Sequence, residues 1–222
     1  MKTVFRGLLA LLLCLIGATS AWAETGITPS SIVIGQTGVF SGPVAEPALQ
    51  YRAGAQLYFD EVNAKGGISG RKIKLVSYDD KFDPKLAAEN TRKLIEEDKV
   101  FALFGYIGTG ATVASIPKIN EHRVPVIGAL SGADGLRDPK LNLIFHTRAS
   151  YGAETGKMVE QLTTTGVKSI AVVFQDDPFG KAGLKSVQGA FTKFNIKPTS
   201  DAPIDMGKLD ALDATTTEIA KT

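Results

Sequence analysis

The chain has 222 residues, 44% of them hydrophobic, which is enough for a sizeable buried core. It carries 25 Lys and Arg against 23 Asp and Glu. This near balance argues against nucleic acid as a partner, because nucleic-acid-binding domains usually show a basic excess. The single cysteine, Cys14, excludes an intramolecular disulfide and any site built from several thiolates.

Residues 1–23 are typical of a secretory signal peptide. Lys2 and Arg6 precede an apolar run, residues 8–16, which is too short to span a bilayer as a helix. Ala21-Trp22-Ala23 then forms a small-x-small cleavage pattern. We therefore expect a cleaved signal and a periplasmic mature chain that starts at the next residue, has no cysteine and is close to neutral.

Apolar runs alternate with amphipathic stretches along the rest of the chain. This alternation is typical of an α/β fold in which parallel sheets are covered by helices. Strands are predicted at 31–36, 72–78, 100–104, 125–130, 142–146, 169–174 and, more weakly, 197–204. Helices are predicted at about 51–62, 83–95, 109–122, 153–165 and 184–194, and from 209 to the end.

The pattern restarts after Ser150, which predicts two lobes. We expect an N-terminal α/β lobe over residues 24–148 and a second α/β lobe over residues 149–222. The second lobe would hold only about two strand–helix units, too few for a sheet with both faces covered, so we expect it to be incomplete. The alternative is one continuous six-stranded domain.

The segments that follow the predicted strands are the candidate ligand site, because open parallel sheets bind ligands beyond the carboxyl ends of their strands. Thr109 begins a predicted helix, where free N–H groups and the helix dipole favour a carboxylate. Tyr106, Tyr151 and Phe179 are candidates for apolar walls. Uncharged groups of this kind suit a zwitterion such as an amino acid, although singly each is also an ordinary turn or cap residue. The segments are 36–43, 105–112, 130–132 and 175–180.

Several enzyme motifs are present only in part, because each lacks a residue that the motif requires. Ala111 stands where a phosphate loop needs lysine, and Val113 replaces the third glycine of a dinucleotide fingerprint. Ser131 comes one position late for a nucleophile elbow. Neither His122 nor His146 is placed in the sequence so that a Ser-His-acid triad can be predicted. The pairs Asp79-Asp80 and Asp176-Asp177 have no further metal ligands at the right spacing. We therefore expect a protein that is not an enzyme, without catalytic residues, metal or cofactor.

Seven short motifs stand in an order and spacing that resemble a known family. The chain resembles the branched-chain amino-acid (Leu/Ile/Val) binding protein family of ABC transport systems, which has the periplasmic binding protein type I fold. The resemblance covers the mature chain to about Asn195. The motifs are Gly38–Pro43, Val62–Arg71, Tyr78–Asp80, Asp83-Pro84, Phe104-Gly105, Val124–Ile127 and Asp176–Gly180.

This resemblance implies two lobes that enclose a ligand between them. Family positions that hold the carboxylate and the ammonium would fall on Thr109, Leu130, Ser131 and Gly132, with Leu130 offering its backbone carbonyl. Phe179 would be the aromatic contact from the second lobe. Family members continue well past this length, and their later contacts, including an acidic partner for the ammonium, have no counterpart here.

The implied function is an exported solute-binding protein, which captures an amino acid or a similar small polar molecule for the membrane permease of an ABC importer. The alternative is the ligand-sensing domain of a receptor for amides or amino acids.

Overall fold

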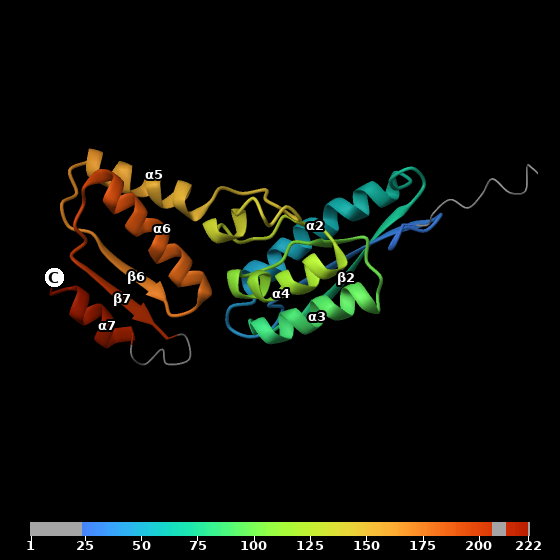
Figure 1. The fold of residues 1–222 in the computed structure, drawn as a ribbon, viewed down its shortest axis with the longest axis horizontal. Helices are drawn as coiled ribbons and strands as arrows, with labels where there is room; N and C mark the ends of the chain where they lie inside the picture. Colours follow the sequence, from blue (N-terminus) through green and yellow to red (C-terminus); the bar gives the residue numbers. More distant parts are fainter. Residues whose placement is uncertain (1–23, 206–211, 222) are drawn as a thin grey trace, which may run out of the picture.

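The computed structural model describes residues 24–205 and 212–221, so the predicted signal peptide lies outside the described residues. It contains a five-stranded sheet in the order β2-β1-β3-β4-β5 and a separate two-stranded sheet, β6-β7. All strand pairs in both sheets are parallel. Figure 1 shows the two sheets in two bodies, here called the first and the second lobe. The two-lobed α/β prediction is confirmed, and one continuous sheet is excluded for the described residues.

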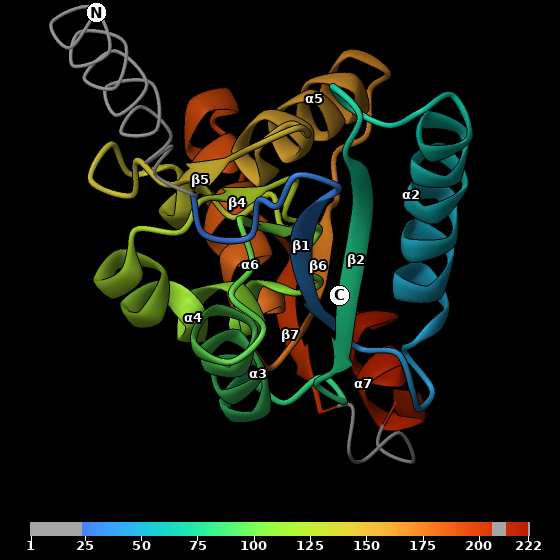
Figure 2. The ribbon, with the colours of Figure 1, turned by 90° about the vertical axis from the view of Figure 1, so that its right-hand side faces the viewer.

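The first lobe contains the five-stranded sheet and three long helices. Helix α2 lies on one side of β1 and β2, and helices α3 and α4 lie on the other (Figure 2). The elements in chain order are β1 (Ser31–Gly38), α2 (Glu46–Ala64), β2 (Lys72–Asp79), α3 (Pro84–Glu96), β3 (Ala102–Phe104), α4 (Thr109–His122), β4 (Val126–Ile127), the 3-10 helix η1 (Asp134–Arg137) and β5 (Ile144–Phe145).

Strand β3 shows how helices on both faces are held. Leu103 is fully buried in a core cluster with Leu94 of α3 and Ile119 of α4. Its neighbour Phe104 points to the opposite face, where its ring centroid lies 5.8 Å from that of Tyr51 and 5.5 Å from that of Phe59, both on α2. Successive strand residues face opposite sides, so an apolar residue at each position is what a doubly covered strand needs.

The second lobe contains α5 (Tyr151–Thr164), β6 (Ala171–Gln175), α6 (Pro178–Phe194), β7 (Ser200–Ile204) and α7 (Leu212–Ile219). Its core joins Val159 of α5 to Ala190 and Phe191 of α6, with Val172 of β6 packed against them. Val173, which points to the other face of β6, remains 45% exposed. Helices α5 and α6 therefore cover one face of this small sheet.

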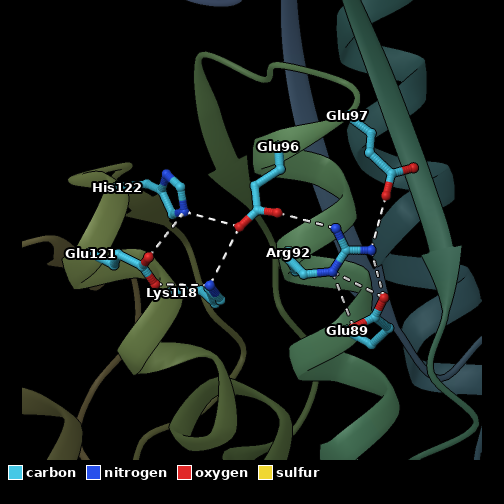
Figure 3. Close-up of polar contacts among 7 residues, drawn as sticks. All are labelled: Glu89, Arg92, Glu96, Glu97, Lys118, Glu121 and His122. Atoms are coloured by element: carbon cyan, nitrogen blue, oxygen red, sulfur yellow. Dashed lines mark hydrogen bonds and ion pairs between the residues drawn. The ribbon is translucent and has the colours of Figure 1, made fainter.

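A surface network of charged residues links α3 to α4 (Figure 3). Arg92 contacts Glu96 at 3.1 Å, and Glu96 in turn lies 3.4 Å from Lys118 Nζ and 3.2 Å from His122 Nε2. The hydrogen bond from Arg92, together with the charge and hydrogen bonds of Lys118 and His122, holds the pKa of Glu96 below its usual value. The remaining members are Glu89, Glu97 and Glu121.

Helices α3 and α4 begin where the sequence predicts, whereas α2 begins at Glu46 and α6 at Pro178, both earlier than predicted. Asp83 caps α3, with its carboxylate accepting from the Lys85 N–H at 2.8 Å and Pro84 in the first turn. Helix α4 spans Thr109–His122, as predicted, and continues through Pro117. None of the helices in the described part of the chain combines the length and the hydropathy that crossing a membrane requires.

Candidate functional site

A cavity of about 270 Å³ lies between the two lobes, at the carboxyl ends of strands from both sheets. Its first-lobe wall comes from the segments after β2 and β3, and its second-lobe wall comes from the ends of β6 and β7. This is the position at which open parallel sheets bind ligands. The lining residues are Phe82, Pro84, Gly110 and Ala111 from the first lobe, and Gln175–Pro178, Ile204 and Asp205 from the second.

The start of α4 forms an electropositive part of the first-lobe wall. Gly108 occupies the N-cap position with φ +98°, and no side chain of the described residues caps the helix. The N–H groups of the first turn have no partner within the helix, and the helix dipole adds partial positive charge there. Since Gly110 and Ala111 line the cavity, this wall favours an anionic group such as a carboxylate.

The second-lobe wall carries carboxylates. Asp177 caps α6 by accepting from the Gly180 N–H at 2.9 Å, and it also accepts from the Gln175 side-chain amide at 2.9 Å. Asp176 forms an ion pair with Lys181 at 2.7 Å. Asp205, at the end of β7, completes this side. The cavity therefore has the uncapped N-terminus of α4 on one wall, and carboxylates beside the Asp177-capped N-terminus of α6 on the other.

Thr109 and Ser131 lie together, but behind the cavity wall. Their hydroxyl oxygens are 2.8 Å apart, and the residues are 3% and 0% exposed. Ser131 also accepts a hydrogen bond from the Ala133 N–H at 3.3 Å. The two residues predicted to meet a ligand through a hydroxyl or an amide thus have their hydroxyls bonded to each other, and the cavity is lined by the next two residues of α4.

Gly132 and Tyr151 form the junction between the lobes. The Gly132 carbonyl accepts from the Tyr151 N–H at 2.6 Å. A Cβ atom on Gly132 would lie 2.5 Å from Tyr151 Cδ1, so only glycine lets the ring approach this closely. The Tyr151 ring in turn meets Phe179 edge-on, with centroids 5.8 Å apart. The Leu130 carbonyl accepts from Arg148 at 3.3 Å.

The expectation that Tyr106 supplies a ligand wall needs correction. Its side chain is fully buried in the first-lobe core, and its hydroxyl lies 2.8 Å from that of Thr91 on α3. Burial raises the pKa of the Tyr106 phenol well above its usual value. The chain turns after β3 so that this ring points inward between α3 and α4, away from the cavity.

Four residues that line the cavity lie outside the predicted segments: Phe82, Pro84, Ile204 and Asp205. Phe82 and Pro84 follow β2, and Ile204 and Asp205 lie at the end of β7, whereas the predicted segments follow β1, β3, β4 and β6. Asp79-Asp80, at the end of the predicted strand 72–78, is the sequence signal that marks the loop of Phe82 as a further strand-end segment. In the described ranges, no group of three or more His, Cys, Asp or Glu residues is placed to hold a metal ion.

Two parallel α/β lobes that face each other across a cavity at their strand ends define the class of two-lobed binding proteins. A family model described as periplasmic binding protein matches residues 31–216. The chain belongs to this family, whose members are binding proteins and not enzymes.

Characterised relatives and solved structures agree with this assignment. The chain is 28% identical to the Leu/Ile/Val-binding protein of Escherichia coli K12, over 92% of this chain and 54% of that protein. It is 28% identical to a branched-chain amino acid transporter substrate-binding protein of Streptococcus pneumoniae in complex with isoleucine, with a TM-score of 0.71 over 85% of this chain and 53% of that one. A solute-binding protein of an ABC transporter from R. palustris, in complex with benzoate, is 25% identical with a TM-score of 0.77, over 86% and 53%.

The chain spans about half the length of the curated relatives it matches.

Proposed function

We propose that this chain captures a small carboxylate, foremost an amino acid, in the cavity between its lobes and presents it to the permease of an ABC importer. Export by the signal peptide at residues 1–23 would place it in the periplasm. Relatives in complex with isoleucine and with benzoate support this class of ligand, because both molecules join a carboxylate to an apolar group.

The observation that carries the proposal is the opposite polarity of the two cavity walls. The carboxylate would accept hydrogen bonds from the free N–H groups of Gly110 and Ala111, at the positive end of the α4 dipole. The ammonium would lie toward Asp176 and Asp205 on the opposite wall. A zwitterion has a charged group for each of the two walls, whereas a simple carboxylate has one only for the wall formed by α4.

The predicted site residues take supporting parts in this arrangement. Thr109 and Ser131 would exchange their mutual hydrogen bond for one to the carboxylate. The Leu130 carbonyl would complete the polar set, and Gly132 lets Tyr151 approach it closely. Tyr151 and Phe179 would form an apolar edge where the two lobes meet.

The proposal is tested by thermal unfolding and calorimetry of the purified protein with three matched compounds. L-leucine has both charged groups, 4-methylpentanoate lacks the ammonium, and leucinol lacks the carboxylate. A bound compound raises stability by RT ln(1 + [L]/Kd). We expect L-leucine to bind most tightly, 4-methylpentanoate more weakly and leucinol most weakly.

ATP and glucose serve as negative controls. Stabilisation by ATP without any response to a carboxylate would contradict the proposal. The variant Gly54→Ala, on the open surface of α2 where an added Cβ meets no atom within 4 Å, should bind as the wild type does.

A further inference from the structure

We propose that Phe82 determines ligand specificity, with its ring setting the size and polarity of the side group that the cavity accepts. This inference rests on the proposed function and deepens it. The N-terminus of α4 on one wall and the carboxylates on the other suit charged groups of a ligand. Phe82 is the one aromatic ring among the residues that line the cavity. Three features of the loop after β2 support the role.

The loop holds Phe82 in an unusual backbone conformation. Lys81 and Phe82 have φ values of +52° and +65°, a left-handed region that side-chain-bearing residues rarely enter, here twice in succession. Each is secured by the carboxylate two residues before it. Asp79 accepts from the Lys81 N–H at 2.9 Å, and Asp80 accepts from the Phe82 N–H at 3.0 Å.

The second carboxylate is itself anchored in the first lobe. Asp80 is fully buried, and its other oxygen accepts from the Thr37 hydroxyl at 3.0 Å. Thr37 accepts from the Asn90 side-chain amide at 3.1 Å, and the Asp80 carbonyl accepts from the Asp83 N–H at 2.8 Å. The loop is thus fixed to β1 and α3, and Asp80 is the residue that positions Phe82 before a ligand arrives.

The ring lies beside the start of α4, where the carboxylate would bind. A Cβ atom on Gly108 would lie 3.3 Å from Phe82 Cε2, so the ring covers the N-cap glycine of that helix. A side group that extends from a carboxylate at Gly110 and Ala111 would meet Phe82 on the first lobe. Pro178 and Ile204 add apolar surface from the second lobe. An anionic side group would lose its hydration there without an oppositely charged side chain, because the charged side chains that line the cavity are carboxylates.

The test measures selectivity, which a merely structural role would not change. Calorimetry gives the affinities of wild type and Phe82→Ala for L-alanine, L-leucine and L-phenylalanine. We expect the leucine-to-alanine affinity ratio to fall by about tenfold in Phe82→Ala, within the range that a few methylene contacts provide. The affinity of Phe82→Ala for L-phenylalanine should rise relative to that for L-leucine, because removal of the Phe82 ring leaves room in the cavity for the larger side group.

Phe145→Ala is the matched control, since Phe145 lies on β5, is 53% exposed and does not line the cavity. It should keep the wild-type ratio. If Phe82→Ala does not fold, Phe82→Leu provides the same comparison with a smaller expected change in the same direction. An unchanged ratio in a folded Phe82 variant overturns this inference alone. A wild-type protein that binds none of these amino acids overturns both the inference and the proposed function.

Discussion

The hydroxyl oxygens of Thr109 and Ser131 lie 2.8 Å apart, in two residues that are almost completely buried. The bond joins the first residue of α4 to the segment that follows β4. It links two strand-end segments into one unit directly behind the cavity wall. Changes at either residue should therefore affect both the stability of the first lobe and ligand binding.

Removing the Thr109 hydroxyl should weaken both properties. In Thr109→Val the side-chain shape is kept while Ser131 loses its hydrogen bond to residue 109, so we expect a loss of about 1–3 kcal/mol in the free energy of unfolding. Urea unfolding measures this loss, and calorimetry with L-leucine should show weaker binding. Thr192→Val on the exposed surface of α6 is the control. Unchanged leucine affinity with reduced stability would assign Thr109 to structure alone.

A methyl group at Gly132 should disturb the junction between the lobes. The added Cβ would lie 2.5 Å from the Tyr151 ring, which is itself buried. We expect Gly132→Ala to lower the free energy of unfolding by about 1–3 kcal/mol, as overpacking does. The same change at Gly54, in a solvent-exposed part of α2, should instead stabilise by roughly 0.5–1 kcal/mol. Equal effects of the two substitutions in urea unfolding would refute this packing.

Asp80 should make stability depend on pH. Burial raises its pKa from 3.8 to about 6, and the nearby carboxylates of Asp79 and Asp83 add to this, against hydrogen bonds from Phe82 and Thr37. The folded state therefore holds the proton more tightly than the unfolded state. Its stabilising contribution is complete below pH 3.8 and is lost as the pH rises through 6.

Between pH 5 and pH 7 we expect Asp80 to lower the free energy of unfolding by about 1 kcal/mol. Asp80→Asn resembles the neutral carboxyl and should remove this part of the pH dependence, while other titrating groups remain the same in both proteins. Urea unfolding of the wild type and of Asp80→Asn at pH 5 and pH 7 measures this difference in pH dependence. Identical pH slopes would show that Asp80 does not titrate in this window.

The charged network between α3 and α4 should contribute only slightly. Its members are partly exposed, so solvent and salt screen the attraction. We expect Glu96→Gln to shift the urea midpoint slightly downward at low ionic strength, and the shift to vanish in 1 M NaCl. A large shift that survives high salt would show that this network does more than join two surface helices.

Much of the fold could be predicted from periodicity and caps. The bounds of α4 agree exactly with the prediction, and Asp83-Pro84 marks the start of α3. Strand β4 is shorter than predicted, ending at Ile127 and not at 130. Gly128 leaves the strand with φ +70°, and its carbonyl accepts a hydrogen bond from Tyr51 of α2. That hydrogen bond joins residues far apart in the chain, so it could not be predicted from the local sequence around the strand.

The site was predictable in part as segments, but not side chain by side chain, because the predicted segments 36–43 and 130–132 do not line the cavity. The segments after β3 and β6 do line the cavity. The direction of Tyr106 depends on the core between α3 and α4, and that of Phe82 depends on two consecutive left-handed residues. Propensity disfavours such a conformation, and only the paired hydrogen bonds of Asp79 and Asp80 make it stable.

Gly110 projects only hydrogen atoms toward the second lobe. A Cβ atom there would lie 3.0 Å from Pro84 Cγ and 3.5 Å from Pro178 Cγ, one on each lobe. A Cβ would thus be tight against Pro84 and in ordinary contact with Pro178, and a side chain that extends beyond Cβ would require the two prolines to lie further apart. How closely the two lobes approach each other at this point thus depends on a residue that has no side chain.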